Sequence, residues 1–295
     1  MSVLRAARMW ALRIAILTYW SLRPRLPWAI AEPILRHRIA RAQRSEKAMA
    51  YARGQMENLL AATDQADRID EKAAAFLAFD MTASEMRWNP RRLTRMRLIG
   101  MENLVRARDL GRGVVISFVH HGNFAGMFGA IASAGVPHGV VSADSILTPY
   151  TGPNMRQHIR NVARSGGLVP ASVGTTGMVE RLKAGEVLAI ATDVPGSTRV
   201  PFAGRTASVS SGAVWAAILA DSPVVLVSHE RDEDGPFLRI GEAVEPGDFD
   251  SATDLLRMIV AHHEGPLLRW PEAAYHPTVC WPVVADDAAA PAGTP

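Results

Sequence analysis

The chain has 295 residues, of which 48% are hydrophobic, and a net charge of +3 at pH 7. Such a chain can bury a substantial core, so a second domain is not required. The nearly neutral charge and the lack of a motif that reads RNA or DNA argue against nucleic-acid binding. A single cysteine, Cys280, excludes an internal disulfide, and we expect it to be a buried apolar side chain rather than a nucleophile.

The first 31 residues combine basic and aromatic side chains and contain no acidic residue. The basic ones are Arg5, Arg8, Arg13, Arg23 and Arg25. The apolar run from Ile14 to Trp20 is too short to span a bilayer, which takes about 20 apolar residues. We therefore predict that residues 1–44 form an amphipathic helical segment at a membrane surface, with aromatic rings at headgroup depth and arginines facing anionic lipid. Arg13 interrupts the longer apolar stretch that contains this run, and Arg23-Pro24-Arg25 follows where a signal peptide would have small residues, so a signal peptide is disfavoured. A helix that only covers the core is the alternative.

Residues 45–108 have the composition of helices. Apolar residues recur with helical period from Glu46 to Ala62, and good helix formers fill Asp70 to Phe79. A second basic cluster surrounds Asn89-Pro90 and consists of Arg87, Arg91, Arg92, Arg95 and Arg97. This cluster by itself indicates no function.

The most informative segment runs from Val114 to Ala125. Its first part is a continuous apolar, β-branched run typical of a buried strand, and Gly122-Asn123 then predicts a tight turn. Between them stand His120 and His121. Side chains at the carboxyl end of a buried strand lie where open α/β sheets bind ligands. Taken alone, two histidines in a turn need have no chemical role.

Two later segments continue the pattern of strands and helices. Arg156, Arg160 and Arg164 are spaced by four, which predicts three guanidinium groups on one helix face before Gly166. The stretch from Val187 to Gly196 predicts a second buried strand that ends in the acidic Asp193 and a turn, and Arg199 and the run from Pro201 to Gly204 follow. Serines at 208–211 suit the start of a helix that continues to Ala220, and residues 223–227 supply the next strand of a parallel unit.

From Arg112 to Gly212 the sequence resembles the lysophospholipid acyltransferase superfamily. It is most similar to the branch of the bacterial lipid A lauroyl/myristoyl acyltransferases and the mycobacterial phosphatidylinositol mannoside acyltransferase. In that branch a strand leads into a His-x-Gly-Asn-Trp-(Glu/Asp) segment, the local form of a His-x₄-(Asp/Glu) motif. His120 matches the motif histidine, and Ala125 stands where the motif acid belongs.

The absent acid at Ala125 matters because a carboxylate normally fixes the tautomer of the imidazole and stabilises the imidazolium. Three explanations are open: an engineered acid-to-alanine variant, an enzyme that uses a carboxylate from elsewhere, or a family member that has lost the chemistry. Asp193 or Asp144 could replace the acid, and His121 could act as a partner base. A structure that places both carboxylates far from the His120 ring would exclude the first two substitutes.

The resemblance implies a transferase that moves a fatty acyl group from an acyl-CoA or acyl-carrier-protein thioester to a hydroxyl of a lipid or glycolipid. His120 would be the general base, and Asp193 a second residue of the catalytic site. The substrate would be positioned by residues that include His121, Gly122 and Asn123 in the loop, Arg160 and Arg164 as phosphate contacts, and Arg199. The rival hypotheses are a noncatalytic lipid-binding homologue and an acyltransferase for a small-molecule natural product.

The expected architecture is α/β, with a mostly parallel central sheet, flanking helices and the N-terminal amphipathic layer. Residues 1–284 would form one acyltransferase-like domain at the cytoplasmic face of the inner membrane, attached peripherally. A helix from Ala252 to His263 is expected, and the Ala-, Asp- and Pro-rich residues 285–295 are predicted to be a disordered tail. The chemistry needs no cofactor. His262, His263 and Glu264 do not have a recognised metal-ligand spacing, so no metal is expected.

Overall fold

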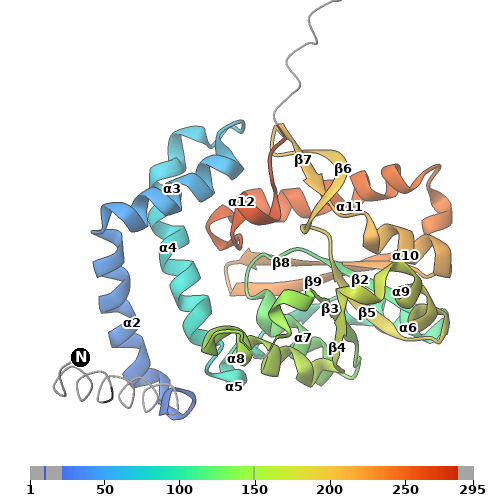
Figure 1. Cartoon of the computed structure of the whole chain (residues 1–295), viewed down its shortest axis with the longest axis horizontal. Coiled ribbons are helices and arrows are strands. Elements are labelled where there is room, and N and C mark those ends of the chain that lie inside the picture. The colour runs from blue at the N-terminus through green and yellow to red at the C-terminus, as the bar shows by residue number, and fades with distance from the viewer. Residues whose placement is uncertain (1–9, 11–21, 149, 285–295) are drawn as a thin grey trace, which may run out of the picture.

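The computed structural model describes residue 10 and residues 22–148 and 150–284. Its centre is a seven-stranded sheet with strand order β1-β9-β8-β2-β5-β3-β4 (Figure 1). The strands are β1 (Arg97–Ile99), β2 (Val114–Phe118), β3 (Gly139–Ser142), β4 (Leu168–Pro170), β5 (Val187–Ala191), β8 (Val224–Asp232) and β9 (Gly235–Val244). The buried strands predicted to begin at Val114 and Val187 are both present, as β2 and β5, side by side at the centre of the sheet.

Five of the strands, from β8 to β4, run parallel. β9 pairs antiparallel with β8, and β1 pairs parallel with β9, so these two strands run in the opposite direction to the rest. Every residue of β2 and β5 is buried, which is why both read as continuous apolar runs. The predicted class, an α/β fold with a mostly parallel sheet, is confirmed.

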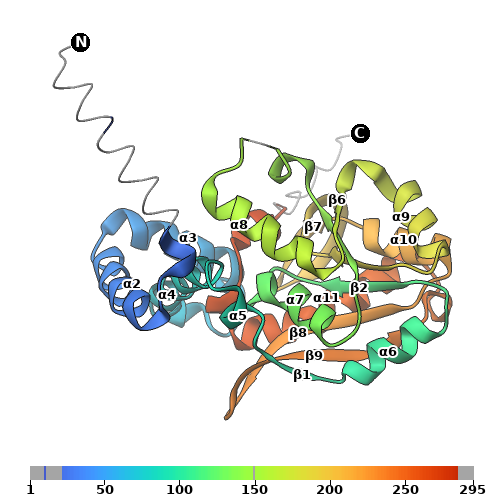
Figure 2. The same cartoon turned by 90° about the horizontal axis from the view of Figure 1, so that it is seen from below.

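Helices cover both faces of the sheet. On one face lie α9 (Gly174–Lys183), α10 (Gly212–Ala220) and α11 (Ala252–Arg269), packed on alternate side chains of β2, β5 and β8 (Figure 1). On the other face lie α6 (Met101–Asp109) and α7 (Phe124–Ser133), with α8 (Pro153–Val162) against α7 (Figure 2). Each face of the sheet has its own buried hydrophobic cluster, and residues at the end of β2 and in the motif loop are divided between the two clusters.

The N-terminal part of the described chain forms a helical layer beside the sheet (Figure 1). It consists of α2 (Trp28–Gln43), α3 (Glu46–Leu60) and α4 (Ile69–Met86), followed by the short α5 (Pro90–Leu93). The Oγ of Ser45 accepts a bond from the backbone N–H of Ala48 and caps α3. Residues 1–9 and 11–21 of the predicted membrane segment lie outside the described residues, as do residues 285–295 of the predicted tail. Within the described ranges, no helix has the length and hydropathy that a membrane crossing requires.

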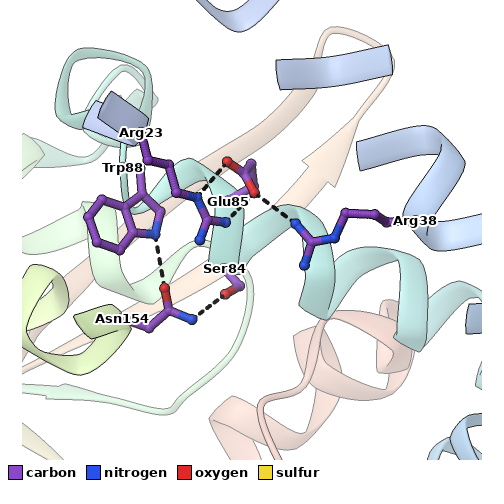
Figure 3. Close-up of polar contacts among 6 residues, drawn as sticks. All are labelled: Arg23, Arg38, Ser84, Glu85, Trp88 and Asn154. Carbon is purple, nitrogen blue, oxygen red and sulfur yellow. Dashed lines mark hydrogen bonds and ion pairs between the residues drawn. The ribbon is translucent and has the colours of Figure 1, made fainter. Parts of the chain in front are cut away.

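A buried polar network fastens this layer to the rest of the molecule (Figure 3). Arg23, just before α2, donates hydrogen bonds from its guanidinium to both carboxylate oxygens of Glu85 near the end of α4, and both side chains are less than a tenth exposed. Arg38 of α2 adds a longer contact of 3.4 Å to the same carboxylate. The Nε1–H of Trp88 donates to Asn154 Oδ1 at the start of α8, 2.9 Å away. Thus α4 is joined to α2 on one side and to α8 on the other.

One hairpin was not expected, and one expected helix differs from the structure. The run from Pro201 to Gly204, which precedes the expected helix, forms the tip of an antiparallel hairpin of β6 (Pro195–Phe202) and β7 (Arg205–Val209). The turn is made possible by positive φ angles at Ala203 and Gly204. The helix that carries Arg156 and Arg160 ends at Val162, and Arg164 lies in the following 3₁₀ turn, so the three arginines do not share one α-helix.

Candidate active site

The motif loop begins where β2 ends and is shaped by Gly122. This glycine has a φ of +61°, and a Cβ at its position would lie 2.5 Å from Cγ of His229, which is carried by β8. Only glycine allows this close approach. Asn123 then begins α7, and its Nδ2–H donates to the carbonyl of Leu93 at 2.7 Å. The loop is therefore fastened both to β8 and to α5.

Asp193 lies directly against His120, because β5 runs parallel to β2 and both strands end at the same edge of the sheet. The His120 Nδ1 and Asp193 Oδ1 atoms are 2.8 Å apart, and the backbone N–H of His120 donates to Asp193 Oδ2 at 2.7 Å. The carboxylate side chain is 1% exposed, whereas that of His120 is 23% exposed. Because a carboxylate only accepts hydrogen bonds, Nδ1 carries the proton and Nε2 is left as the basic nitrogen.

Cys280 completes the cluster around Asp193. The thiol sulfur, a ring nitrogen of His120 and a carboxylate oxygen of Asp193 lie within 4.8 Å of one another. Burial, followed by the charge and hydrogen bonding of Asp193, raises the pKa of the Cys280 thiol well above its usual range. The thiol is therefore neutral at physiological pH and is suited to donate to the carboxylate, not to act as a nucleophile.

The atoms of this cluster are of types that bind zinc. However, both oxygens of Asp193 already accept hydrogen bonds from His120, and a metal would require loss of the Cys280 proton. The three side chains are thus arranged as a hydrogen-bonded group. Among the residues that the structure describes, no other such cluster of potential ligands occurs.

Aromatic rings surround the His120 imidazole. The ring centroids of Phe124, Phe118 and Tyr275 lie 4.8, 5.6 and 6.0 Å from that of His120. This apolar wall strengthens the interaction between His120 and Asp193, because charge is poorly screened where water is excluded.

A C-terminal segment, residues 270–281, closes over the motif loop. The backbone N–H of Tyr275 donates to the carbonyl of His120 at 2.8 Å, and that of Gly122 donates to Ala273 at 2.9 Å. His121 Nε2 lies 2.9 Å from the carbonyl of Trp270, and burial lowers the pKa of this 1% exposed histidine to about 4. His121 is thus a neutral, buried part of this junction, a position that favours a structural role.

Two cavities adjoin the loop. The larger, here called the apolar cavity, measures about 320 Å³ and is lined mainly by side chains such as Phe79, Met86, Met96, Phe237 and Trp270. Asn123 and His229 are among its polar lining residues. The second, here called the small cavity, measures about 10 Å³ and adjoins Arg87, Gly122, Phe124 and Tyr275. Both cavities share Phe79 and Ala83 of α4, so the N-terminal layer forms one wall of each.

The remaining predicted residues are placed as follows. Ala125 lies in the first turn of α7, 6% exposed and packed in the apolar cluster on that face of the sheet. Asp144 is bound to Ser172 and not to His120. Arg160 and Arg164 are exposed on and after α8, and Arg199 is exposed on β6. None of the three arginines is among the residues that line the two cavities.

Several residues that the structure brings to the site carry no signal in the sequence. Neither Phe79 of α4 nor Tyr275 belongs to a motif. Arg87 is one of five clustered arginines in the sequence, yet it is 8% exposed and borders the small cavity. The sequence shows only that Arg87 lies near the end of a predicted helical region, and this position does not reveal that its side chain is buried.

The family model of the bacterial lipid A biosynthesis acyltransferases matches residues 2–254. A solved structure of the 1-acyl-sn-glycerophosphate (LPA) acyltransferase PlsC from Thermotoga maritima has a TM-score of 0.39 and 16% sequence identity, covering 67% of this chain and 83% of its own. That likeness is too distant to bear on the site. No curated protein matches the chain.

Proposed function

Because the chain belongs to the bacterial lipid A biosynthesis acyltransferase family, we propose that it moves a fatty acyl group from an acyl-CoA or acyl-carrier-protein thioester to a hydroxyl of a lipid or glycolipid. The observation that carries this proposal is the 2.8 Å contact between His120 Nδ1 and Asp193 Oδ1. Asp193 supplies the carboxylate that the sequence lacks at position 125.

In the proposed reaction His120 is the general base. Its Nε2 takes the proton of the acceptor hydroxyl as the oxygen attacks the thioester carbonyl, and Asp193 stabilises the imidazolium that forms. The tetrahedral intermediate then collapses, the carbon–sulfur bond breaks, and the thiolate takes the proton from His120. The products are an ester and a free thiol, and the base is regenerated without a cofactor.

The apolar cavity is the proposed site of the acyl chain. Its volume of about 320 Å³ lies within the range of ligand pockets, roughly 300–1,000 Å³, and its walls are mainly apolar. Because Asn123 of the motif loop also lines this cavity, the thioester end of a bound acyl chain would lie at the loop. Arg160, Arg164 and Arg199 remain proposed contacts for phosphate groups of the substrates.

A peripheral attachment to the cytoplasmic face of the inner membrane accompanies this proposal. Ile30 and Ile34 are one turn apart on α2, each 52% exposed, and Leu22 just before the helix is 56% exposed. Exposed apolar residues of this kind, next to a basic N-terminal sequence, are suited to a membrane surface. A glycolipid acceptor, as in the mycobacterial phosphatidylinositol mannoside branch, is the proposed substrate of such a single-domain enzyme.

The test is thiol release from acyl-CoA and acyl-carrier-protein donors in the presence of a total lipid extract. We expect activity in the unaltered chain, and its loss in His120→Ala but not in His37→Ala, since His37 is exposed and far along the chain from the motif. If His120→Ala keeps the activity of the unaltered chain, the proposed base is wrong.

Ala125→Glu tests whether the missing motif acid matters. Since Asp193 already contacts His120, the added carboxylate should give no gain in rate, and it would bury a charge among apolar side chains. Ala134→Glu, exposed at the end of the same helix, is the matched control. If Ala125→Glu alone is active, the unaltered chain is an impaired homologue, and a lipid-binding or accessory role is favoured.

A further inference from the structure

Arg87 is a buried cation that forms no ion pair with a carboxylate in the described part of the chain. It caps the C-terminal end of α4 and is 8% exposed, and its Nε is inaccessible to solvent and has no hydrogen-bond partner. No carboxylate in the described ranges forms an ion pair with it within 4.0 Å. A buried charge of this kind destabilises the folded state unless it is compensated. The missing partner is therefore expected to arrive with the substrate.

The guanidinium and the proposed catalytic base both lie near the ring of Tyr275. The central carbon of the guanidinium is 5.9 Å from the ring centroid of Tyr275, and that ring is 6.0 Å from His120. The rings of His158 and His120 both lie against Phe124, with centroids 5.9 and 4.8 Å from that of Phe124. Burial, followed by the charges of Arg87 and His120, lowers the pKa of His158 to about 3. His158 Nδ1 is a second buried polar atom here without a partner.

The size of the small cavity limits what the partner can be. Its volume of about 10 Å³ is close to that of one water-sized probe, which holds a single oxygen atom and not a phosphate group. Asp80 also borders this cavity, but its carboxylate makes no ion pair with Arg87. The space between Arg87, Phe124 and Tyr275 is thus suited to one oxygen that gains negative charge.

We propose that Arg87 donates its Nε–H to the carbonyl oxygen of the thioester as that oxygen becomes an oxyanion. This inference rests on the proposed acyl transfer. When the acceptor oxygen bonds to the carbonyl carbon, the π electrons move to the carbonyl oxygen, which Arg87 stabilises. When the double bond re-forms, the sulfur leaves as a thiolate and takes its proton from His120.

The backbone around Arg87 is held in place before any substrate binds. The carbonyl of Arg87 accepts a hydrogen bond of 2.8 Å from Nδ2 of Asn161 on α8, and its N–H bonds to α4. Burial raises the pKa of Tyr275, although Arg87 opposes this shift, so the phenol remains neutral beside the guanidinium. Fixed donors that need not reorganise are the most effective stabilisers of an oxyanion.

The experiment compares Arg87→Gln and Arg87→Lys with Arg91→Gln, which removes the same charge from an exposed position of the same cluster. Both transfer to the lipid extract and the slow hydrolysis of the donor without acceptor are measured. We expect Arg87→Gln to lower kcat by about 10²–10³-fold in both reactions, the usual effect of losing one oxyanion donor, with KM nearly unchanged. Arg87→Lys should restore only part of the rate, and Arg91→Gln should match the unaltered chain.

Two results would overturn the inference. If Arg87→Gln raises the KM for the acceptor but leaves kcat and donor hydrolysis unchanged, Arg87 binds an anionic acceptor instead. If it lowers only the Tm while Arg87→Lys has full activity, the charge is purely structural. These results are distinguishable from a failure of the proposed function. If the proposed function is wrong, His120→Ala will release thiol at the same rate as the unaltered chain.

Discussion

At the scale of single residues, the site depends on which nitrogen of His120 carries the proton. Asp193 accepts both the Nδ1–H and the backbone N–H of this histidine, so the ring and the loop are oriented by the same carboxylate. A neutral amide at this position can still accept the backbone bond. It also offers its own N–H to Nδ1, which favours the wrong tautomer.

We therefore expect Asp193→Asn to lower kcat by about 10⁴-fold, the loss seen when the acid of a serine protease triad is replaced in the same way. The fold should be retained. Asp144→Asn, which alters a carboxylate bound to Ser172, is the matched control and should keep full activity. Steady-state thiol release checks both variants. A kcat for Asp193→Asn within tenfold of the unaltered chain would contradict the assigned orientation.

The sequence predicted some of these residues for physical reasons. His120 and Asp193 follow continuous apolar runs, and such runs reveal parallel central strands whose ends must meet. The direct contact between them was one of the alternatives considered for the missing acid. Arg87 could not be singled out, because clustered arginines are usually exposed and only the packing of α4 against the loop buries this one.

At the scale of elements, the layer of α2, α3 and α4 is fixed to the sheet by Glu85. This carboxylate accepts bonds from Arg23 and contacts Arg38, while α4 also lines both cavities with Phe79 and Ala83. The position of the layer and the shape of the site are thus linked through one helix.

Glu85→Ala leaves Arg23 buried without its carboxylate. Removing one partner of a buried ion pair costs about 3–5 kcal/mol, so the free energy of unfolding should fall by that amount. Glu32→Ala breaks an exposed pair with Arg36 and should cost less than about 1 kcal/mol. Urea unfolding of both variants measures the difference. Equal losses in the two variants would show that the network in Figure 3 does not hold the layer.

Helices and strands can be predicted best from the sequence where a single pattern, such as a continuous apolar run, determines the type of element. Strands β2, β5 and β8 and helix α10 follow from apolar runs with flanking turn residues. The β6–β7 hairpin was missed because its turn places Ala203, a residue with a Cβ, at a positive φ, which no turn signal announces. The length of α11 was underestimated, since Pro266 lies inside it.

At the scale of the whole molecule, three buried histidines make folding sensitive to acid. Burial is the main cause that lowers the pKa of His121 to about 4 and those of His229 and His263 to about 3. In the unfolded chain each titrates near 6.5. Their neutral state costs nothing above pH 6.5, but below it the unfolded chain binds more protons, so stability falls as the pH drops toward 4.

Each of these histidines should remove about 1.4 kcal/mol of stability per pH unit within that window. We expect the free energy of urea unfolding to fall clearly between pH 7.5 and pH 5. His263→Gln should remove the contribution of one proton to the slope of the unfolding free energy against pH, although it also lowers the stability at pH 7.5. The exposed His37→Gln should leave that slope unchanged. A pH-independent free energy of unfolding over this range would refute the buried neutral state.

The closure of the motif loop by residues 270–281 also bears on how the protein becomes active in the cell. β2 and β5 are synthesised early, but Tyr275, Ala273 and Cys280 reach His120 and Asp193 only after a further stretch of chain has been made. At about 5–20 residues per second, the roughly 80 residues between Asp193 and Tyr275 take on the order of ten seconds to translate. During that time a ribosome-bound chain carries the proposed base and acid while the site is still open to water, so we expect no processing of acyl donors until translation has passed the C-terminal segment.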